Sequence, residues 1–209
     1  IVSAYSNSEI CAVLKERKVE IIELQHGLIG PEHRGYNYVV KDKRLPTPNK
    51  IYVYNEFWKQ ELIDAGYYSQ DQIRVTGRLK YKLIRRDISI DRHYIVFTGQ
   101  AILQDQIIKF LEDGATLIAD KDINLDVLYI PHPNERQSNI EKIKKYLNSF
   151  GNIKIGLPDN LTTEECIYYS LAHVSIYSSC HFDAIFFKNK TYIFDIIENN
   201  PMKYYIVKY

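Results

Sequence analysis

Cysteine, methionine and tryptophan are scarce in this sequence of 209 residues, which holds three cysteines, one methionine and one tryptophan. The cysteines are odd in number and lack the spacing of a metal site, so neither a disulfide framework nor a zinc cluster is indicated. Each one stands in or beside an apolar segment, at Cys11, Cys166 and Cys180. We therefore expect reduced thiols in a cytoplasmic protein.

Long hydrophobic runs are also missing. No apolar run approaches the ~20 residues that a helix needs to cross a bilayer, and residues 1–5 lack the basic and apolar regions of a secretory signal. These absences predict a soluble protein. The chain begins with Ile1 rather than Met, which is typical of a processed or trimmed polypeptide.

Neither sign of charge dominates. Lys and Arg number 27 against 26 Asp and Glu, so the balance gives no electrostatic reason to expect a nucleic-acid partner. With 45% hydrophobic and 25% charged residues, the composition is that of a globular protein with one large core or two small ones.

Three common catalytic signatures are absent. The sequence has no phosphate-binding loop that ends in Gly-Lys-Ser/Thr and no Gly-x-Gly-x-x-Gly, so ATP hydrolysis and dinucleotide redox chemistry lose their usual markers. It has no Gly-x-Ser-x-Gly nucleophile elbow either. His173 and His181 flank a predicted strand without a second ligand at recognisable spacing, so we expect neither a metal nor a cofactor.

What is present in the second half is an alternation of short β-branched or aromatic runs with helical stretches. The predicted strands are Tyr94–Phe97, Val127–Ile130, Ile153–Ile155, Val174–Tyr177 and Thr191–Ile196. The predicted helices lie near Ile102–Glu112, Asn139–Phe150, Thr163–Ala172 and His181–Lys188. Capping boxes at Ser138-x-x-Glu141 and Thr162-x-x-Glu165 support two of the helix starts. This alternation predicts βαβ crossovers and a parallel sheet.

The first half repeats this plan less completely. Ser6-x-x-Glu9 predicts a helix to about Lys18, followed by the strands Val19–Leu24, Ile51–Tyr54 and Ile73–Thr76 and a helix near Phe57–Ala65. The loop between Gly27 and Lys50 is long enough to suggest a function or mobility. We predict an α/β chain of two Rossmann-like domains, residues 1–85 and 86–209, with the first incomplete and residues 78–92 as the link.

In an open parallel α/β sheet, ligands bind beyond the carboxyl ends of the strands, where helix N-termini present N–H groups to anions. Polar, small and basic residues gather at these ends of the predicted strands. They are Gln25-His26-Gly27, Thr76-Gly77-Arg78, Thr98-Gly99-Gln100, His132-Pro133-Asn134-Glu135, Leu157-Pro158 and Ser178-Ser179. This pattern suits a phosphate-bearing ligand.

His132 is one of the strongest candidates, because Pro131 and Pro133 restrict the backbone on both sides. Its imidazole would be held in one direction, ready to donate a hydrogen bond to a phosphate. The alternative is a turn histidine that only caps the strand. Because the residue ends a strand and precedes a capped helix, we favour the functional interpretation.

His26 follows a predicted strand and precedes Gly27, which lets the backbone turn sharply or approach a ligand. With an ordinary pKa of ~6.5, histidine can act as a general base toward an acceptor hydroxyl. Glu32 and His33, further along the same loop, are reserve candidates for the base. The alternatives are a structural histidine at 26 and solvated loop side chains at 32 and 33.

Ser178 and Ser179 stand at the end of a predicted strand, directly before a helix that holds Asp183. Their hydroxyls and the following N–H groups could cradle a phosphate, although serine is also a common N-cap. The triplet Glu112-Asp113-Gly114 falls at a predicted helix end, where glycine is a routine C-cap, so a catalytic acid pair is not indicated.

These motifs resemble those of known transferases. Three parts of the first half look like the acceptor-side half of GT-B glycosyltransferases for bacterial capsule and surface polysaccharide. They are Gln25-His26-Gly27, residues 47–54 with Phe57-Trp58, and Thr76-Gly77-Arg78. Pro131-His132-Pro133 and Ser178-Ser179-x-x-x-Asp183 are similar to the His-Pro and Ser-Ser motifs of transferases with cytidine-activated donors. Those include sialyl- and Kdo-transferases and the CDP-glycerol glycerophosphotransferases.

The resemblance implies a role for each candidate. It assigns the donor nucleotide to Gly99, Gln100, His132, Pro133, Glu135, Ser178 and Ser179. It assigns the acceptor to Gln25, Gly27 and Arg78, with His26 as the base. It implies no bound metal, because protein groups and helix dipoles would stabilise the leaving phosphate.

The expected function is therefore transfer of a sugar or polyol phosphate from a nucleotide-activated donor, CMP- or CDP-linked, to an oligosaccharide or lipid-linked acceptor. Such a role implies peripheral association with membrane assembly machinery at the inner face of the plasma membrane. Two alternatives stay open: a non-hydrolysing UDP-sugar 2-epimerase, and a catalytically silent domain that scaffolds polysaccharide assembly.

Overall fold

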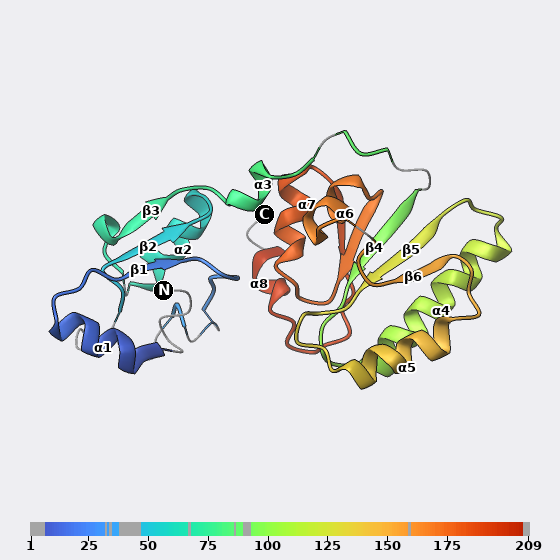
Figure 1. Ribbon diagram of the computed structural model, residues 1–209, viewed down its shortest axis with the longest axis horizontal. Helices are drawn as coiled ribbons and strands as arrows, with labels where there is room; N and C mark the ends of the chain where they lie inside the picture. The colour runs from blue at the N-terminus through green and yellow to red at the C-terminus, as the bar shows by residue number, and fades with distance from the viewer. Residues whose placement is uncertain are drawn as a thin grey trace. The chain divides into compact units, whose positions relative to one another are not determined.

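The computed structural model describes residues 7–31, 33, 35–37, 47–66, 68–85, 87–89, 93–158 and 160–206. The chain divides into two compact units, Ile1–Lys82 and Leu83–Tyr209, here called unit 1 and unit 2. Each unit has its own parallel sheet, of three strands in unit 1 and five in unit 2 (Figure 1). The predicted α/β class with two parallel sheets is confirmed.

Unit 1 is built on three short strands in the order β1 (Ile22–Leu24), β2 (Lys50–Val53) and β3 (Ile73–Val75). Its helical elements are α1 (Ser8–Glu16), α2 (Glu56–Ala65), the 3-10 turn η2 (Gln70–Gln72) and α3 (Leu79–Lys82). Helix α2 begins where the Asn55 side chain accepts the Trp58 N–H and ends at Gly66, which adopts a left-handed conformation with φ of 69°. An Asn side chain at the start of a helix and a left-handed glycine at its end are both common helix caps.

Unit 2 has the strand order β6 (Ile153–Ile155), β5 (Asp126–Ile130), β4 (Tyr94–Thr98), β7 (Ala172–Ser175) and β8 (Lys190–Ile193). Its helices are α4 (Gln104–Asp120), α5 (Gln137–Leu147), α6 (Thr163–Tyr169), α7 (Cys180–Phe186) and α8 (Met202–Ile206). Unit 2 begins with the central strand β4 and adds β5 and β6 on one side of it. The chain then returns to the other side of β4, where it adds β7 and β8. This reversal is the topological switch of doubly wound folds, beside which their ligands bind.

The two faces of this sheet have separate cores because strand side chains alternate in direction. Phe97, Val127 and Tyr129 pack with α4 and α5, whereas Val96 and Leu128 pack with α6 and α7. Figure 1 shows the two helix pairs on opposite faces of the sheet. Unit 2 is thus a three-layer α/β/α domain.

The start of unit 2 is tied to α6. The Arg85 guanidinium meets Glu165 through two hydrogen bonds of 2.8 and 3.0 Å and also donates to the Asn160 carbonyl oxygen. Glu165 accepts the Thr162 N–H as well, so the predicted capping box is confirmed. The hydrogen bonds from Arg85 and from the Thr162 backbone lower the pKa of Glu165 to about 2.

Several predicted boundaries are wrong. Helix α4 continues through Gly114 to Asp120, so the triplet at 112–114 lies inside a helix instead of at its end. The box at Ser138 is wrong too, because α5 begins two residues earlier than predicted, at Gln137, and its N-cap, Arg136, makes no side-chain cap. The predicted opening at Ser6 lies outside the described residues.

Strand β7 begins and ends two residues earlier than predicted, at Ala172 and Ser175. Its parallel pairing with β4 fixes this register, with Ile95 opposite Ala172 and Thr98 opposite Ser175. His173 therefore lies within the strand rather than beside it. Among the helices of the described residues, none is both long and apolar enough to cross a membrane.

Candidate functional site

Three neighbouring strands of unit 2 end in register. Thr98 closes β4 and pairs with Ile130 at the end of β5 and with Ser175 at the end of β7. The Ser175 hydroxyl donates to the Thr98 carbonyl oxygen at 2.6 Å, and the Gly99 N–H donates to the Ile130 carbonyl oxygen at 2.8 Å. Because the strands are parallel, the segments at 99–100, 131–135 and 176–179 all leave the sheet at the same edge.

The segments after β4 and β5 are joined by the ring of Tyr129. Its hydroxyl donates to Glu135 at 3.2 Å, and the other carboxylate oxygen of Glu135 accepts from Gln104 at 3.3 Å. Burial, together with the nearby Glu135 charge, raises the pKa of Tyr129, so the phenol stays a neutral donor. A side chain at Gly99 would collide with this ring, since a Cβ there would lie 2.4 Å from the Tyr129 oxygen. Gly99 and Glu135 thus have structural roles in shaping this edge.

His132 has its tautomer fixed by its own turn. Its Nδ1 accepts the Asn134 N–H at 3.1 Å, so Nδ1 carries a lone pair and Nε2 carries the proton of the neutral ring. The side chain is half-buried. His132 therefore offers an N–H donor at Nε2 when its ring is neutral.

Ser178 shows the same arrangement. Its Oγ accepts the Cys180 N–H at 3.2 Å, which leaves its O–H as a donor. Ser179 is the N-cap residue of α7, but its side chain makes no capping hydrogen bond. Both serines are half-buried, while Gln100 is buried and Pro133 exposed. The structure thus gathers the predicted donor-side residues at one edge of the sheet.

The predicted acceptor-side residues of unit 1 form a second group. The buried Gln25 accepts the Tyr54 N–H at 2.9 Å and donates to the Gly27 carbonyl oxygen at 2.8 Å. The Tyr54 hydroxyl returns a bond to the Gln25 carbonyl oxygen, and Arg78 lies 5.2 Å from the centre of the Tyr54 ring. The Gln25 amide is therefore engaged in joining the ends of β1 and β2.

His26 lies beside Glu23, a buried acid. Its Nδ1 is 2.7 Å from the Tyr36 hydroxyl and 3.8 Å from Oε1 of Glu23, whose side chain is fully buried. The His26 side chain keeps 23% of its surface exposed. Burial and the neighbouring His33 lower the pKa of His26, so the ring is neutral and able to accept a proton near pH 7.

His33 joins this group through ring contacts, with its centroid 4.7 Å from that of Tyr36 and 5.9 Å from that of His26. Its Nδ1 accepts the Gly35 N–H at 3.2 Å, so its proton lies on Nε2 when the ring is neutral. Burial lowers its pKa as well. Glu32, the other reserve candidate, lies outside the described residues.

Sequence reasoning missed Glu23 and Tyr36. The signal for Glu23 is an acid in an inward-facing position, because Ile21, Glu23 and Gln25 alternate with more exposed residues and all three are buried. No comparable signal marks Tyr36 among 18 tyrosines. The contact between Tyr36 and His26 joins two residues that are ten apart in the sequence, a relation that periodicity does not reveal.

Two other histidines of unit 2, His173 in β7 and His181 in α7, are buried and share a hydrogen-bond partner in β8. His173 bonds Thr98 through Nε2 and Thr191 through Nδ1, both at 2.8 Å, and Nδ1 of His181 reaches the same Thr191 at 2.7 Å. Burial lowers the pKa of His181 to about 4 and that of His173 well below its ordinary value. Across the part of the chain that the structure describes, no group of three or more His, Cys, Asp or Glu residues could hold a metal ion.

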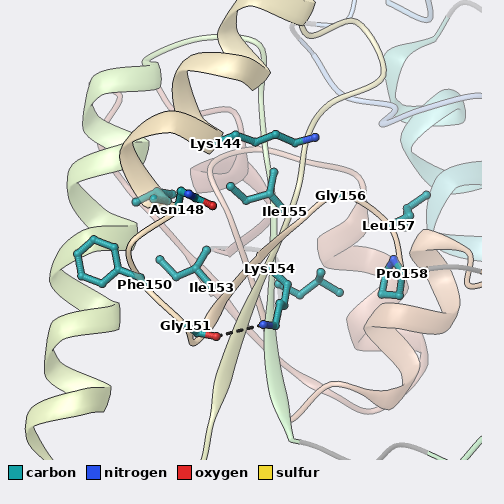
Figure 2. A pocket seen from close by; sticks show the side chains of 12 residues that line it. Lys144, Asn148, Phe150, Gly151, Ile153, Lys154, Ile155, Gly156, Leu157 and Pro158 are labelled. Atoms are coloured by element: carbon teal, nitrogen blue, oxygen red, sulfur yellow. Dashed lines mark hydrogen bonds between the residues drawn. The ribbon is translucent and has the colours of Figure 1, made fainter.

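A cavity of about 530 Å³ follows the outer edge of β6 (Figure 2). It extends from Lys144 and Asn148, at the end of α5, to Leu157 and Pro158, which follow the strand. Lys154, which also lines it, donates to the Gly151 carbonyl oxygen at 3.1 Å. Its described lining includes none of the residues predicted to bind donor or acceptor.

Comparison with known proteins shows the fold. No protein-family model and no curated protein sequence matches the chain, but solved structures do. The S. aureus protein MnaA, solved with UDP, is 16% identical with a TM-score of 0.63, and the match covers 92% of this chain and 55% of that one. The Neisseria meningitidis UDP-GlcNAc 2-epimerase, bound to UDP-GlcNAc, is 14% identical with a TM-score of 0.59, covering 93% and 58%.

A third structure is that of the wall teichoic acid polymerase TagF soaked with CDPG. It is 15% identical with a TM-score of 0.61, and the match covers 89% of this chain and 51% of that one. The chain thus has a GT-B-like fold, shared with UDP-GlcNAc 2-epimerases and with TagF, and it spans little more than half the length of these proteins.

Proposed function

We propose that this chain belongs to a nucleotide-sugar transferase, in which unit 2 binds a nucleotide-activated donor and His26 of unit 1 accepts the proton of the acceptor hydroxyl. The donor would be linked to CMP or CDP and would carry a sugar or a polyol phosphate. The acceptor would be an oligosaccharide or lipid-linked chain of a bacterial surface polysaccharide.

The observation that carries this proposal is the hydrogen bonding of two polar side chains beyond the carboxyl ends of the unit 2 strands. His132 and Ser178 each use an acceptor site on a backbone N–H two residues further on. Each therefore keeps a hydrogen-bond donor, at Nε2 of His132 and at the hydroxyl of Ser178, and donors suit an anionic phosphate. Both follow strands that end in register with β4, at the switch point of the sheet.

The chemistry follows from these roles. The acceptor oxygen attacks the electrophilic carbon or phosphorus of the donor while its proton passes to the imidazole of His26. The bond from that centre to the leaving phosphate oxygen breaks, and its electron pair leaves with the nucleotide. Donors from His132 and Ser178 would stabilise the charge that develops on the phosphate.

Product analysis tests the transfer. The full chain is incubated with CMP-, CDP- and UDP-activated donors, with and without oligosaccharide acceptors, and free nucleotide and products are quantified. A transferase releases nucleotide in proportion to acceptor glycosylation, and His26→Ala abolishes that release. Conversion of UDP-N-acetylglucosamine without acceptor would instead identify an epimerase, the activity named for several structures of similar fold. Binding of nucleotide without either reaction would indicate a non-catalytic domain.

A further inference from the structure

We propose that the open edge of β6 is a docking site for an acidic, extended segment of a partner protein, which would add to the sheet as a further strand. The site consists of this edge, the end of α5 and the cavity of about 530 Å³ that both of them line. The described lining includes none of the residues predicted to bind donor or acceptor. The inference is therefore independent of the proposed transfer.

The main chain of β6 shows which groups face the open edge. In the sheet order β6 is the last strand on its side, and among the described residues it pairs with β5 alone. The Asn152 carbonyl oxygen accepts the Val127 N–H at 2.8 Å, and the Gly156 N–H donates to the Tyr129 carbonyl oxygen at 2.9 Å. Because successive residues of a strand turn their N–H and C=O groups to opposite sides, Ile155 directs both of its groups away from β5. An added strand would find a donor and an acceptor there.

Apolar side chains line the cavity beside this edge. They include Leu147 at the end of α5, Phe150 and Ile155. Phe150 and Ile155 are half-buried, and Leu157, which follows the strand, is 49% exposed. The side chains of an added strand would alternate in direction. Every second residue would therefore pack against this apolar lining while the residues between them stay in water.

Charge determines which kind of segment fits. Lys144 and Lys154 line the cavity, and its described lining includes no acidic residue. Ile153 and Ile155 pack with the core of α4 and α5, so Lys154, which lies between them in β6, points to the opposite face of the sheet. Lys144 comes from α5, and Figure 2 shows the two lysines on either side of Ile155. Cations on both sides of the edge suit acidic side chains spaced along an extended chain better than a single small anion.

A second copy of this chain is the main competing occupant, because open strand edges tend to pair with one another. Pairing β6 with its own copy would bring the Lys154 side chains of both copies into one interface, together with both copies of Lys144. A lysine on an edge strand opposes such self-association, and like charges across an interface suppress the wrong partner. The same two lysines attract an acidic segment, so they favour a different protein as the partner.

The probe is a short peptide of alternating glutamate and valine with blocked ends. It is titrated into the full ¹⁵N-labelled chain, and NMR follows both binding and the hydrogen exchange of the Ile155 N–H. We expect a Kd at or below about 1 mM. Because strand addition places the Ile155 N–H in a hydrogen bond, saturating peptide should slow its exchange at least about tenfold.

Two peptides and two variants serve as controls. The same peptide with lysine in place of glutamate, and one with every backbone amide methylated, should each bind at least about tenfold more weakly. The double variant Lys144→Glu, Lys154→Glu should weaken binding of the acidic peptide by a similar factor. Lys190→Glu reverses an exposed lysine of β8, at the other edge of the same sheet, and should leave the affinity unchanged. Circular dichroism checks that each variant is folded.

Equal affinity for the acidic and the methylated peptide would overturn the proposal, since binding would then depend on charge alone. No binding of the acidic peptide at about 1 mM, or an affinity that the folded double variant leaves unchanged, would overturn it as well. A free chain that is already dimeric, with the Ile155 N–H protected from exchange, would instead assign this edge to a second copy.

Discussion

Gly99 lies directly against the phenol of Tyr129, with no room between them for a side chain. A Cβ at residue 99 would lie 2.4 Å from the Tyr129 oxygen and 2.8 Å from the ring carbon that bears it. Tyr129 is fully buried and bonded to Glu135, so it cannot swing away without breaking that bond. The close approach of these two residues sets the path of the chain as it leaves β4.

We expect Gly99→Ala to destabilise unit 2 by about 1–3 kcal/mol, the range typical of overpacking in a core. Urea unfolding followed by circular dichroism measures this loss. Gly151→Ala is the matched control, since a Cβ there meets no atom within 4 Å. Adding Tyr129→Phe to Gly99→Ala removes the closest clashing atom and should restore part of the stability. A Gly99→Ala protein as stable as the wild type would contradict this packing.

The ion pair between Arg85 and Glu165 should contribute to the folding stability of unit 2. Arg85→Ala leaves an acid that is only 2% exposed without its guanidinium partner, and a buried charge without its partner is costly. We expect a lower urea midpoint for Arg85→Ala. Lys109→Ala, which removes a pair with Asp113 in which both side chains are well exposed, should leave the midpoint unchanged. Equal effects of the two variants would count against this assignment.

The buried histidines His173 and His181 should make the folding stability of unit 2 sensitive to acid. The folded state holds the pKa of His181 at about 4, while the unfolded chain has the ordinary ~6.5. As pH falls below about 6.5, the unfolded state binds protons first, so stability declines until the pH reaches the folded value. From pH 7 to pH 5 we expect a loss of about 2 kcal/mol from His181 alone.

Unfolding free energies at the two pH values check this expectation. Circular dichroism follows the whole chain, and the fluorescence of Trp58, the single tryptophan, follows unit 1 separately. His181→Gln should remove most of its share of the pH dependence, whereas His93→Gln, at an exposed position, should not. A pH dependence that survives His181→Gln in full would contradict the assignment.

The sheets could be predicted because their strands are short apolar runs that alternate with helices, as at 94–97 and 127–130. Boundaries depended on tertiary contacts that the sequence does not reveal. Helix α4 passes through Gly114 because Leu111, Ala115 and Ile118 continue its buried stripe, and this packing outweighs the ~1 kcal/mol cost of an interior glycine. The register of β7 was set by its pairing with β4 rather than by local composition.

The candidate site was predictable only in part. The strand-end rule located His132, Ser178 and His26, because parallel topology determines which residues leave the sheet at one edge. It could not locate Tyr36, which does not follow a strand directly and contacts His26 from ten residues further along the chain. Nor could it indicate that His132 and Ser178 would both be donors, since that follows from hydrogen bonds to N–H groups two residues away.

Isothermal titration of the full chain with CMP, CDP and UDP tests the central claim most directly. We predict that a cytidine nucleotide binds, that His132→Ala and Ser178→Ala each weaken binding by about tenfold through loss of a charge-assisted hydrogen bond of roughly 1.4 kcal/mol, and that His93→Ala leaves the affinity unchanged. Binding of none of the three nucleotides, or a His132→Ala affinity equal to that of the wild type, would contradict it.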